Sequence, residues 1–233
     1  MSLAGRTAVV TGGGRGIGRA VALALAERGA RVAVAARTSE EIGAVAREIG
    51  ARGGEARAVR CDVARAADVA ELFRVAALEL GPVDLLVNDA GVVIRRPLVD
   101  LSEDDWDRTL DVNLKGAYLC SRAALAGPAG MLARKGGRIV NVGSISGTLG
   151  TPKLTAYCAS KWGLTGLTKA LAEELRESGV FVAVVLPGSV DTDMLKGSGF
   201  APAMQPADVA KVIAFLCDEA PFAMTGCAVE AFG

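Results

Sequence analysis

Tyrosine and lysine stand four residues apart in the stretch Tyr157-Cys158-Ala159-Ser160-Lys161. On a helix this spacing puts both side chains on one face, so an ammonium can stand near a phenol. A free phenol has a pKa of about 10, and an ammonium about 4 Å away, at an effective dielectric of about 20, would lower it by about three units. The pair is a candidate for proton transfer to or from a substrate, and an ordinary surface helix pair is the alternative.

Histidine is absent from the chain. Its absence excludes Ser-His and Cys-His nucleophile pairs and removes the commonest metal ligand. The five cysteines are Cys61, Cys120, Cys158, Cys217 and Cys227. Because they lie far apart and form no C-x-x-C pair, we expect buried reduced thiols and no metal site. Any proton chemistry must therefore use another kind of side chain.

A glycine cluster follows the apolar run Thr7–Thr11 and precedes an alanine-rich segment. It lacks the lysine and the hydroxyl of a Walker A loop, and no three of its glycines fit the plain G-x-G-x-x-G dinucleotide motif. The spacing present is T-G-x-x-x-G-x-G over residues 11–18. Here Gly12 can make the turn, Gly16 can bring backbone N–H groups to a pyrophosphate, and Gly18 can let a helix pack on the strand. A glycine-rich turn without a ligand is the alternative.

The overall composition restricts the class of protein. The chain has 233 residues, 51% of them hydrophobic and 22% charged, which suits one large domain over residues 1–233. Lys and Arg number 26, as do Asp and Glu, so no basic excess indicates a nucleic-acid partner. No stretch approaches the length of a membrane span, and the N-terminus reaches a polar glycine loop before a signal-peptide core could form. We expect a soluble, cytoplasmic protein that binds neither nucleic acid nor membrane.

Short apolar runs alternate with helical patterns along the whole chain. We expect strands at Thr7–Thr11, Val32–Ala35, Ala56–Arg60, Leu85–Asn88, Arg138–Val142, Val180–Leu186 and Cys227–Ala231, and helices near 16–28, 39–50, 66–80, 102–126, 156–178 and 206–217. This alternation predicts an α/β fold: a single Rossmann-type, doubly wound domain with a parallel sheet of about seven strands and helices on both faces.

Turn signals mark the ends of several elements. Ser102 begins a capping-box-like start for the fourth helix, and the Gly-Pro-Ala-Gly stretch at 127–130 should end it. Pro187 and Gly188 follow an apolar strand directly, at the sheet edge where ligands sit in open α/β folds. The polar loop from there to Gln205 could be a mobile lid.

With these motifs in order, the chain resembles the short-chain dehydrogenase/reductase family. The stretches that carry the resemblance are TGGGRGIG at the first turn, CDV at 61–63, NDAG at 88–91, DVNLKG around Asn113, NVGSISG around Ser144, YCASK at 157–161 and PGSVDTDM at 187–194. Within the family, the motifs look most like those of 3-oxoacyl-[acyl-carrier-protein] reductases and related carbonyl reductases.

The resemblance implies catalytic roles for four side chains. Tyr157 would be the general acid in carbonyl reduction and the base in alcohol oxidation, and Lys161 would assist it while holding the nicotinamide ribose hydroxyls. Ser144 would donate a hydrogen bond to the substrate oxygen, and Asn113 would anchor a water that links Lys161 to solvent. Found alone, Ser144 would be a turn hydroxyl and Asn113 a helix-surface amide.

The resemblance also implies a nicotinamide dinucleotide site. It assigns Asp62 and Val63 to the adenine ring, Asn88, Ala90 and Gly91 to the adenosine side, and Val190 and Thr192 to the carboxamide. Asp89 stands where the family often has a second asparagine, a position expected mainly to support the sheet. Further cofactor-binding candidates are Gly12, Gly14, Arg15, Gly16, Ile17 and Gly18 in the glycine cluster, with Pro187 and Gly188 after the sixth strand.

The cofactor choice depends on the end of the second strand. A dinucleotide site selective for NAD usually has an acidic residue there, whereas this chain has Ala36, Arg37, Thr38 and Ser39. A guanidinium and hydroxyls suit a 2′-phosphate, and Arg15 could approach it from the other side. We therefore expect NADP(H) to be preferred over NAD(H), with a solvated surface arginine as the alternative reading of Arg37.

The substrate end is mostly apolar. The candidate pocket residues are Val93, Ile94, Leu149, Leu154, Ser189, Met194 and Leu195, which suit an aliphatic or aryl carbonyl better than a sugar. Arg95 and Arg96 could meet an acidic carrier, with surface solvation as the alternative. We expect NADPH-dependent, reversible reduction of a ketone or 3-oxoacyl carbonyl, the substrate being a small molecule or an acyl thioester. The alternatives are an NAD(P)-dependent alcohol or sugar dehydrogenase and a non-catalytic dinucleotide-binding regulator.

The fourth and fifth expected helices are apolar on more than the one face needed to cover a sheet. The resemblance suggests that they pair with their symmetry mates, while the C-terminal segment pairs across another axis. We expect a homotetramer, with a dimer as the alternative.

Overall fold

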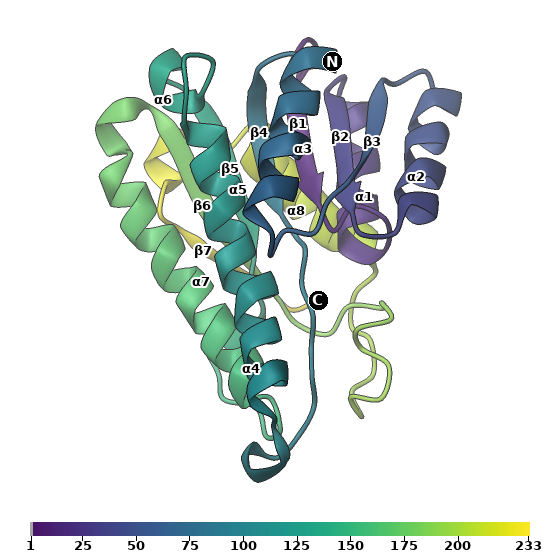
Figure 1. Cartoon of the computed structure of the whole chain (residues 1–233), viewed down its shortest axis with the longest axis vertical. Coiled ribbons are helices and arrows are strands. Elements are labelled where there is room, and N and C mark those ends of the chain that lie inside the picture. The colour runs from purple at the N-terminus through teal and green to yellow at the C-terminus, as the bar shows by residue number, and fades with distance from the viewer. Residues whose placement is uncertain (1) are drawn as a thin grey trace.

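The computed structural model describes residues 2–233 and contains, within them, one sheet of seven strands in the order β3-β2-β1-β4-β5-β6-β7 (Figure 1). Every neighbouring pair is parallel. The strands are β1 (Thr7–Thr11), β2 (Arg31–Ala36), β3 (Ala56–Arg60), β4 (Val83–Asn88), β5 (Gly137–Val142), β6 (Val180–Pro187) and β7 (Ala228–Ala231). Each expected apolar run forms a strand, with small shifts at its ends.

Helices cover both faces of the sheet because successive strand side chains point to opposite sides. Val10 belongs to a core with residues of α1, α2 and α8, and Val9 to a second core with residues of α3, α5 and α7. The helices are α1 (Gly16–Glu27), α2 (Ser39–Ala51), α3 (Ala66–Glu79), α4 (Glu103–Leu110), α5 (Gly116–Leu125), α6 (Met131–Arg134), α7 (Thr155–Glu174) and α8 (Pro206–Asp218). The doubly wound α/β fold is confirmed.

The helix expected over 102–126 is divided in two. A π-helical turn at Asp111–Lys115 separates α4 from α5, and Asn113 within it is buried. Such a turn inserts a residue and rotates the side chains that follow, and it is frequent at functional sites. The helix α5 ends at Leu125, directly before the Gly-Pro-Ala-Gly stretch at 127–130 that was expected to break it. The short helix α6 was not anticipated.

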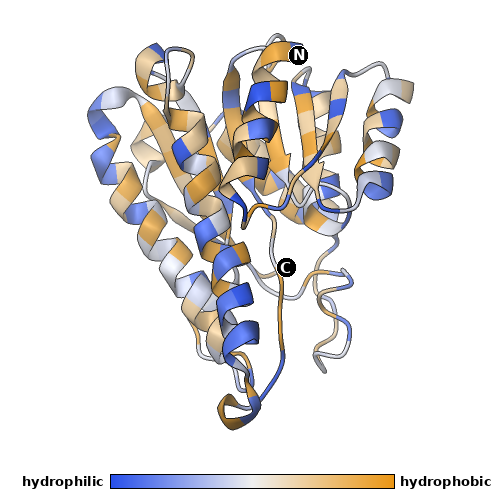
Figure 2. Cartoon of the chain, in the orientation of Figure 1, coloured by the Kyte–Doolittle hydropathy of each residue, from blue (hydrophilic) through white to orange (hydrophobic). Residues whose placement is uncertain are grey.

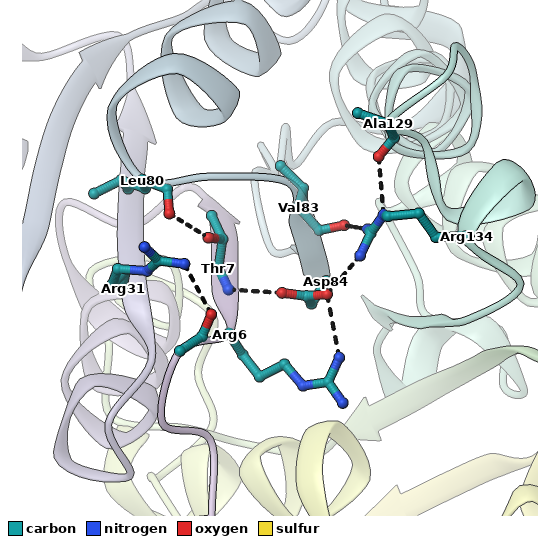
Figure 3. A network of polar contacts seen from close by, with 9 residues as sticks. Arg6, Thr7, Arg31, Leu80, Val83, Asp84, Ala129 and Arg134 are labelled. Carbon is teal, nitrogen blue, oxygen red and sulfur yellow. Dashed lines mark hydrogen bonds and ion pairs between the residues drawn. The ribbon is translucent and has the colours of Figure 1, made fainter.

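A polar network closes the amino-terminal edge of the sheet (Figure 3). The buried Asp84 carboxylate accepts hydrogen bonds from the backbone N–H of Thr7 (3.0 Å) and from the guanidinium groups of Arg134 (2.7 Å) and Arg6 (3.3 Å). The Thr7 hydroxyl donates to the carbonyl of Leu80 at 2.8 Å. These bonds hold β1, β4 and the end of α6 together at the edge opposite the strand carboxyl ends.

Apolar residues concentrate in the strands and in the helix faces against them, while charged residues lie on the outer turns (Figure 2). Within residues 2–233, all five cysteines are free thiols, and Cys61, Cys120 and Cys217 are buried. Burial raises the pKa of the Cys61 and Cys217 thiols to about 12, so both stay protonated and unreactive at neutral pH. Over the same residues, no helix combines the length and the apolarity that crossing a bilayer requires.

Candidate functional site

A long groove runs along the carboxyl ends of the strands, the lower edge of the sheet in Figure 1. The strand order reverses between β1 and β4, which is the point where open α/β sheets hold ligands. The loops after β1 to β6 line the groove, whose volume is about 1850 Å³. This exceeds the ~300–1,000 Å³ of a pocket for one small ligand and provides room for an extended one together with a second molecule.

The glycine cluster forms one wall of the groove. Gly12 has a φ of +68°, and a Cβ there would lie 2.8 Å from the backbone nitrogen of Ala90. A Cβ at Gly18 would lie 2.4 Å from the carbonyl oxygen of Gly12. The residue before α1, Arg15, provides no side-chain cap for the helix. Backbone N–H groups at the start of α1 are thus accessible to an anion, as a dinucleotide diphosphate requires. Gly14, Gly16 and Ile17 also line the groove.

The adenosine end of the groove is formed by the loops after β2 and β3. Arg37 and Thr38 are exposed there, and within residues 2–233 Arg37 forms no ion pair. Asp62 and Val63 line the same end, and the Asp62 carboxylate accepts a hydrogen bond from the Ala64 N–H at 3.1 Å. Arg108 and Val112 also line this end, although no sequence motif pointed to them; their spacing of four residues within an expected helix was the available signal.

Arg15 is paired with two carboxylates. Its guanidinium is 3.5 Å from the Asp193 carboxylate, in the loop between β6 and α8 (the lid loop), and 3.9 Å from the Glu41 carboxylate on α2. The expected approach of Arg15 to a 2′-phosphate would require it to leave these partners. In this structure it joins the glycine cluster to the lid loop.

The proton-transfer candidates lie together on the first turns of α7. Tyr157 is 7% exposed and Lys161 4%. The Lys161 Nζ is 5.7 Å from the centre of the Tyr157 ring and donates a 2.7 Å hydrogen bond to the carbonyl of Val142. Ser144 follows β5, and its Oγ accepts a hydrogen bond from the Ser146 N–H at 3.1 Å, which leaves the Ser144 hydroxyl proton free for another acceptor.

The expected lowering of the Tyr157 pKa by Lys161 is not found in the free protein. Burial raises the pKa of Tyr157 above its ordinary value, and a hydrogen bond with Ser144 offsets only part of this. Burial also lowers the pKa of Lys161 to about 8, although the Asp89 carboxylate opposes the shift. Lys161 thus loses its proton more readily than an ordinary lysine but still carries its charge for the most part at neutral pH, and Tyr157 remains a neutral phenol.

Asn113 is a buried residue and not a helix-surface amide. Its Oδ1 accepts from the Val92 N–H at 2.8 Å, and its Nδ2 donates to the Val92 carbonyl at 2.9 Å and to the Ser160 hydroxyl at 3.0 Å. The amide thus joins the loop after β4 to the helix that carries Tyr157 and Lys161.

Asn88 was expected at the cofactor and Asp89 in support of the sheet, and the structure has the two the other way round. The Asn88 amide donates to Asn141 Oδ1 at 2.8 Å and to the Ser121 hydroxyl at 3.3 Å, so Asn88 supports the sheet and does not line the groove. Asp89 lines the groove instead, together with Ala90 and Gly91. The expectation that Asp89 mainly supports the sheet was wrong.

The loop after β6 closes the other side of the groove. Val190 pairs with Met204, and a Cβ at Gly16 would lie 3.2 Å from the Thr192 methyl. Arg95 donates a 2.7 Å hydrogen bond to the carbonyl of Met194, while Arg96 is 3.6 Å from the Asp105 carboxylate. Other residues on this side are Pro187, Gly188, Ser189 and Leu195, facing Val93, Ile94, Leu149 and Leu154 across the groove.

Comparison with known proteins gives consistent matches. A family model described as short chain dehydrogenase matches residues 6–200. The chain is 40% identical to a 3-oxoacyl-[acyl-carrier-protein] reductase of Synechocystis sp., over 97% of this chain and 94% of that protein. A reductase of the same name from Staphylococcus aureus is 36% identical, with 98% and 97% covered.

Solved structures superpose over the whole chain. A putative short-chain alcohol dehydrogenase from Sinorhizobium meliloti has a TM-score of 0.92 and 38% identity, with all of this chain and 96% of that chain covered. A blue fluorescent protein from a metagenomic library, solved in complex with NADPH, has a TM-score of 0.92 and 34% identity, with 100% and 98% covered.

Proposed function

Because this chain belongs to the short-chain dehydrogenase family and is thus an NAD(P)-dependent oxidoreductase, we propose that it uses NADPH to reduce the ketone of a 3-oxoacyl thioester to a secondary alcohol. The observation that carries the proposal is the convergence of Tyr157, Ser144 and Lys161 at the centre of the groove. The names of the relatives support the 3-oxoacyl thioester as substrate.

Reduction of a ketone needs a hydride at carbon and a proton at oxygen. A bound nicotinamide dinucleotide would supply the hydride. Tyr157 donates its phenolic proton to the carbonyl oxygen, and Ser144 donates a hydrogen bond to the same oxygen as negative charge develops. The raised pKa of Tyr157 keeps the residue in its acid form at neutral pH, which is the form that donates the proton in carbonyl reduction.

The walls of the groove fit a dinucleotide at the glycine end. A diphosphate would be held by the first-turn N–H groups of α1, which the glycines leave uncovered. Arg37 and Thr38 would hold a 2′-phosphate, since an arginine and not an acidic residue directly follows β2. Lys161 would hold the ribose hydroxyls next to the nicotinamide. The preference for NADPH over NADH rests on these side chains.

The opposite end of the groove suits an acyl chain. Leu149 is 58% exposed and Met194 37% exposed, so apolar surface faces the open cleft beside Tyr157. Burying an alkyl chain against it would contribute about 25 cal/mol per Å² of apolar area. A sugar would find few polar partners there, which favours the reductase over the alternative sugar dehydrogenase.

A substrate panel tests the proposal. The protein is incubated with NADPH or NADH and an acetoacetyl thioester, simple ketones, secondary alcohols or sugars, and nicotinamide absorbance is followed. The fastest turnover is expected for the acetoacetyl thioester with NADPH. Turnover of sugars alone would replace this proposal with the sugar dehydrogenase, and tight cofactor binding without turnover of any compound would indicate a non-catalytic regulator.

A further inference from the structure

Asp89 brings a carboxylate to the start of α1, the part of the groove that would hold an anion. The side chain follows β4, whose end is held by hydrogen bonds from the N–H groups of Asp89 and Ala90 to the Thr11 hydroxyl, both 3.2 Å. Asp89 Oδ2 lies against Gly18, because a Cβ on that glycine would be 2.6 Å from it. The carboxylate thus occupies the vicinity of a first-turn N–H group of α1.

Lys161 lies beside the same loop after β4, near Gly91. A Cβ at Gly91 would lie 3.7 Å from the Asp89 carbonyl oxygen and 3.9 Å from Lys161 Nζ. Burial raises the pKa of Asp89 to about 7, while Lys161 and the Gly18 N–H lower it. The carboxyl group therefore changes protonation near neutral pH while it lies against Gly18 and within the electrostatic influence of Lys161.

The other charged groups nearby are directed elsewhere. Arg15 and Arg19, at the start of α1, pair with carboxylates of α2 and the lid loop. The ends of β1 and β5 contribute no charged side chain beside Asp89, and Asn113 from the π-helical turn is neutral. On α7, Lys161 and the neutral phenol of Tyr157 face it. Lys161 is thus the cation that balances Asp89 within residues 2–233.

A carboxylate and a diphosphate compete for one helix N-terminus, since both are anions. We propose that Asp89 couples dinucleotide binding to pH: neutral, it leaves the first turn of α1 to the cofactor, and ionised, it places a negative charge there that opposes the diphosphate. This inference rests on the proposed use of a nicotinamide dinucleotide. Asp89 is a positioning residue in this scheme, because it acts through α1 and not on the substrate.

Calorimetry of cofactor binding tests the coupling without any turnover. NADH is titrated into the wild-type protein in buffers of different ionisation enthalpy, because it lacks the 2′-phosphate that would itself exchange protons. Binding at about pH 7.5 should take up protons from the buffer, and affinity should fall about tenfold between about pH 6 and about pH 8.

Asp89→Asn is the matched variant, since it keeps the side-chain shape and removes the ionisable group. Its affinity for NADH should depend less on pH over this range than that of the wild type, and the part of the proton uptake that Asp89 contributes should be lost. Glu173→Gln, which removes an exposed carboxylate at the far end of α7, should behave as wild type.

Three outcomes separate the proposed coupling of binding to pH from the proposed use of a nicotinamide dinucleotide. Absence of proton uptake by the wild type overturns the coupling whether or not the variant folds. Equal pH dependence in wild type and Asp89→Asn overturns it as well, while leaving the proposed function intact. Failure of every protein to bind NADH or NADPH overturns both.

Discussion

The side-chain amide of Asn113 donates a 3.0 Å hydrogen bond to the hydroxyl of Ser160 on α7, and that hydroxyl donates to the carbonyl of Tyr157 at 2.7 Å. Two segments far apart in the sequence are joined by this chain of hydrogen bonds directly beneath the catalytic candidates. The orientation of Tyr157 thus depends on a residue in the π-helical turn before α5.

Removal of that amide should affect both stability and turnover. Asn113→Ala leaves the Val92 N–H and the Ser160 hydroxyl without their partner, which should cost about 1–3 kcal/mol of unfolding free energy. Turnover should fall as Tyr157 loses its support. Urea denaturation and kcat measurements check this, with Ser160→Ala as a milder comparison. An Asn113→Ala protein as stable and as active as wild type would contradict it.

Tyr157→Phe should abolish most turnover while leaving the fold and cofactor affinity intact. The variant keeps the buried ring and removes only the hydroxyl, so kcat should fall by about 10²–10⁴, as for a lost general acid. Cofactor fluorescence titration and steady-state kinetics on the same preparation separate binding from catalysis. A Phe variant that retains a tenth of the activity refutes the role of Tyr157.

Arg37 should set the choice of cofactor. Charge-assisted hydrogen bonds to a 2′-phosphate contribute about 1.5–3 kcal/mol, so kcat/KM should favour NADPH over NADH by about 10- to 100-fold. The double variant Ala36→Asp/Arg37→Ala should lose or reverse this preference. Arg47→Ala, an exposed arginine on α2, is the control and should keep it. Equal kcat/KM values for the two cofactors in the wild type would reject the idea.

Asp84 should matter for stability and not for the reaction. Asp84→Ala leaves two guanidinium groups and the Thr7 N–H without their acceptor at the edge of the sheet opposite the groove (Figure 3). The loss should be about 3–5 kcal/mol of unfolding free energy. Arg6→Ala, whose side chain is 59% exposed, should cost less than about 1 kcal/mol. The comparison is made by urea denaturation, with kcat of the folded fraction unchanged.

Assembly into a homotetramer remains our proposal for the outer face of α5 and α7. Trp162 is 53% exposed and Tyr118 46%, and Leu167 and Ala170 lie further along α7. A charge there, as in Ala170→Glu or Leu167→Glu, should weaken both assembly and turnover, because the same helix carries Tyr157. Ala44→Glu on α2 changes an exposed alanine in the same way and should do neither. Light scattering that shows a fully active wild-type monomer at micromolar concentration would exclude the tetramer.

The fold was predictable because its signals are local. Every apolar run of the expected length formed a strand, and the glycine spacing over residues 11–18 specified a turn that admits no side chains. Tyr157 and Lys161 share a helix face by their spacing alone. The division of the fourth helix was not visible, because a π-helical turn is set by packing against neighbours such as Val63, which a Cβ at Gly116 would approach to 2.7 Å.

The charges of the site were decided only by the tertiary structure. From the sequence, Asn88 and Asp89 are adjacent polar residues at a strand end, and either could face the groove. The fold turns Asn88 into the sheet and Asp89 toward Gly18 and Lys161. Spacing predicted that Lys161 would lower the pKa of Tyr157, but burial, which depends on every element around the groove, raises it. Sequence spacing thus determines which groups can meet, whereas their protonation follows from desolvation by residues distant in the chain.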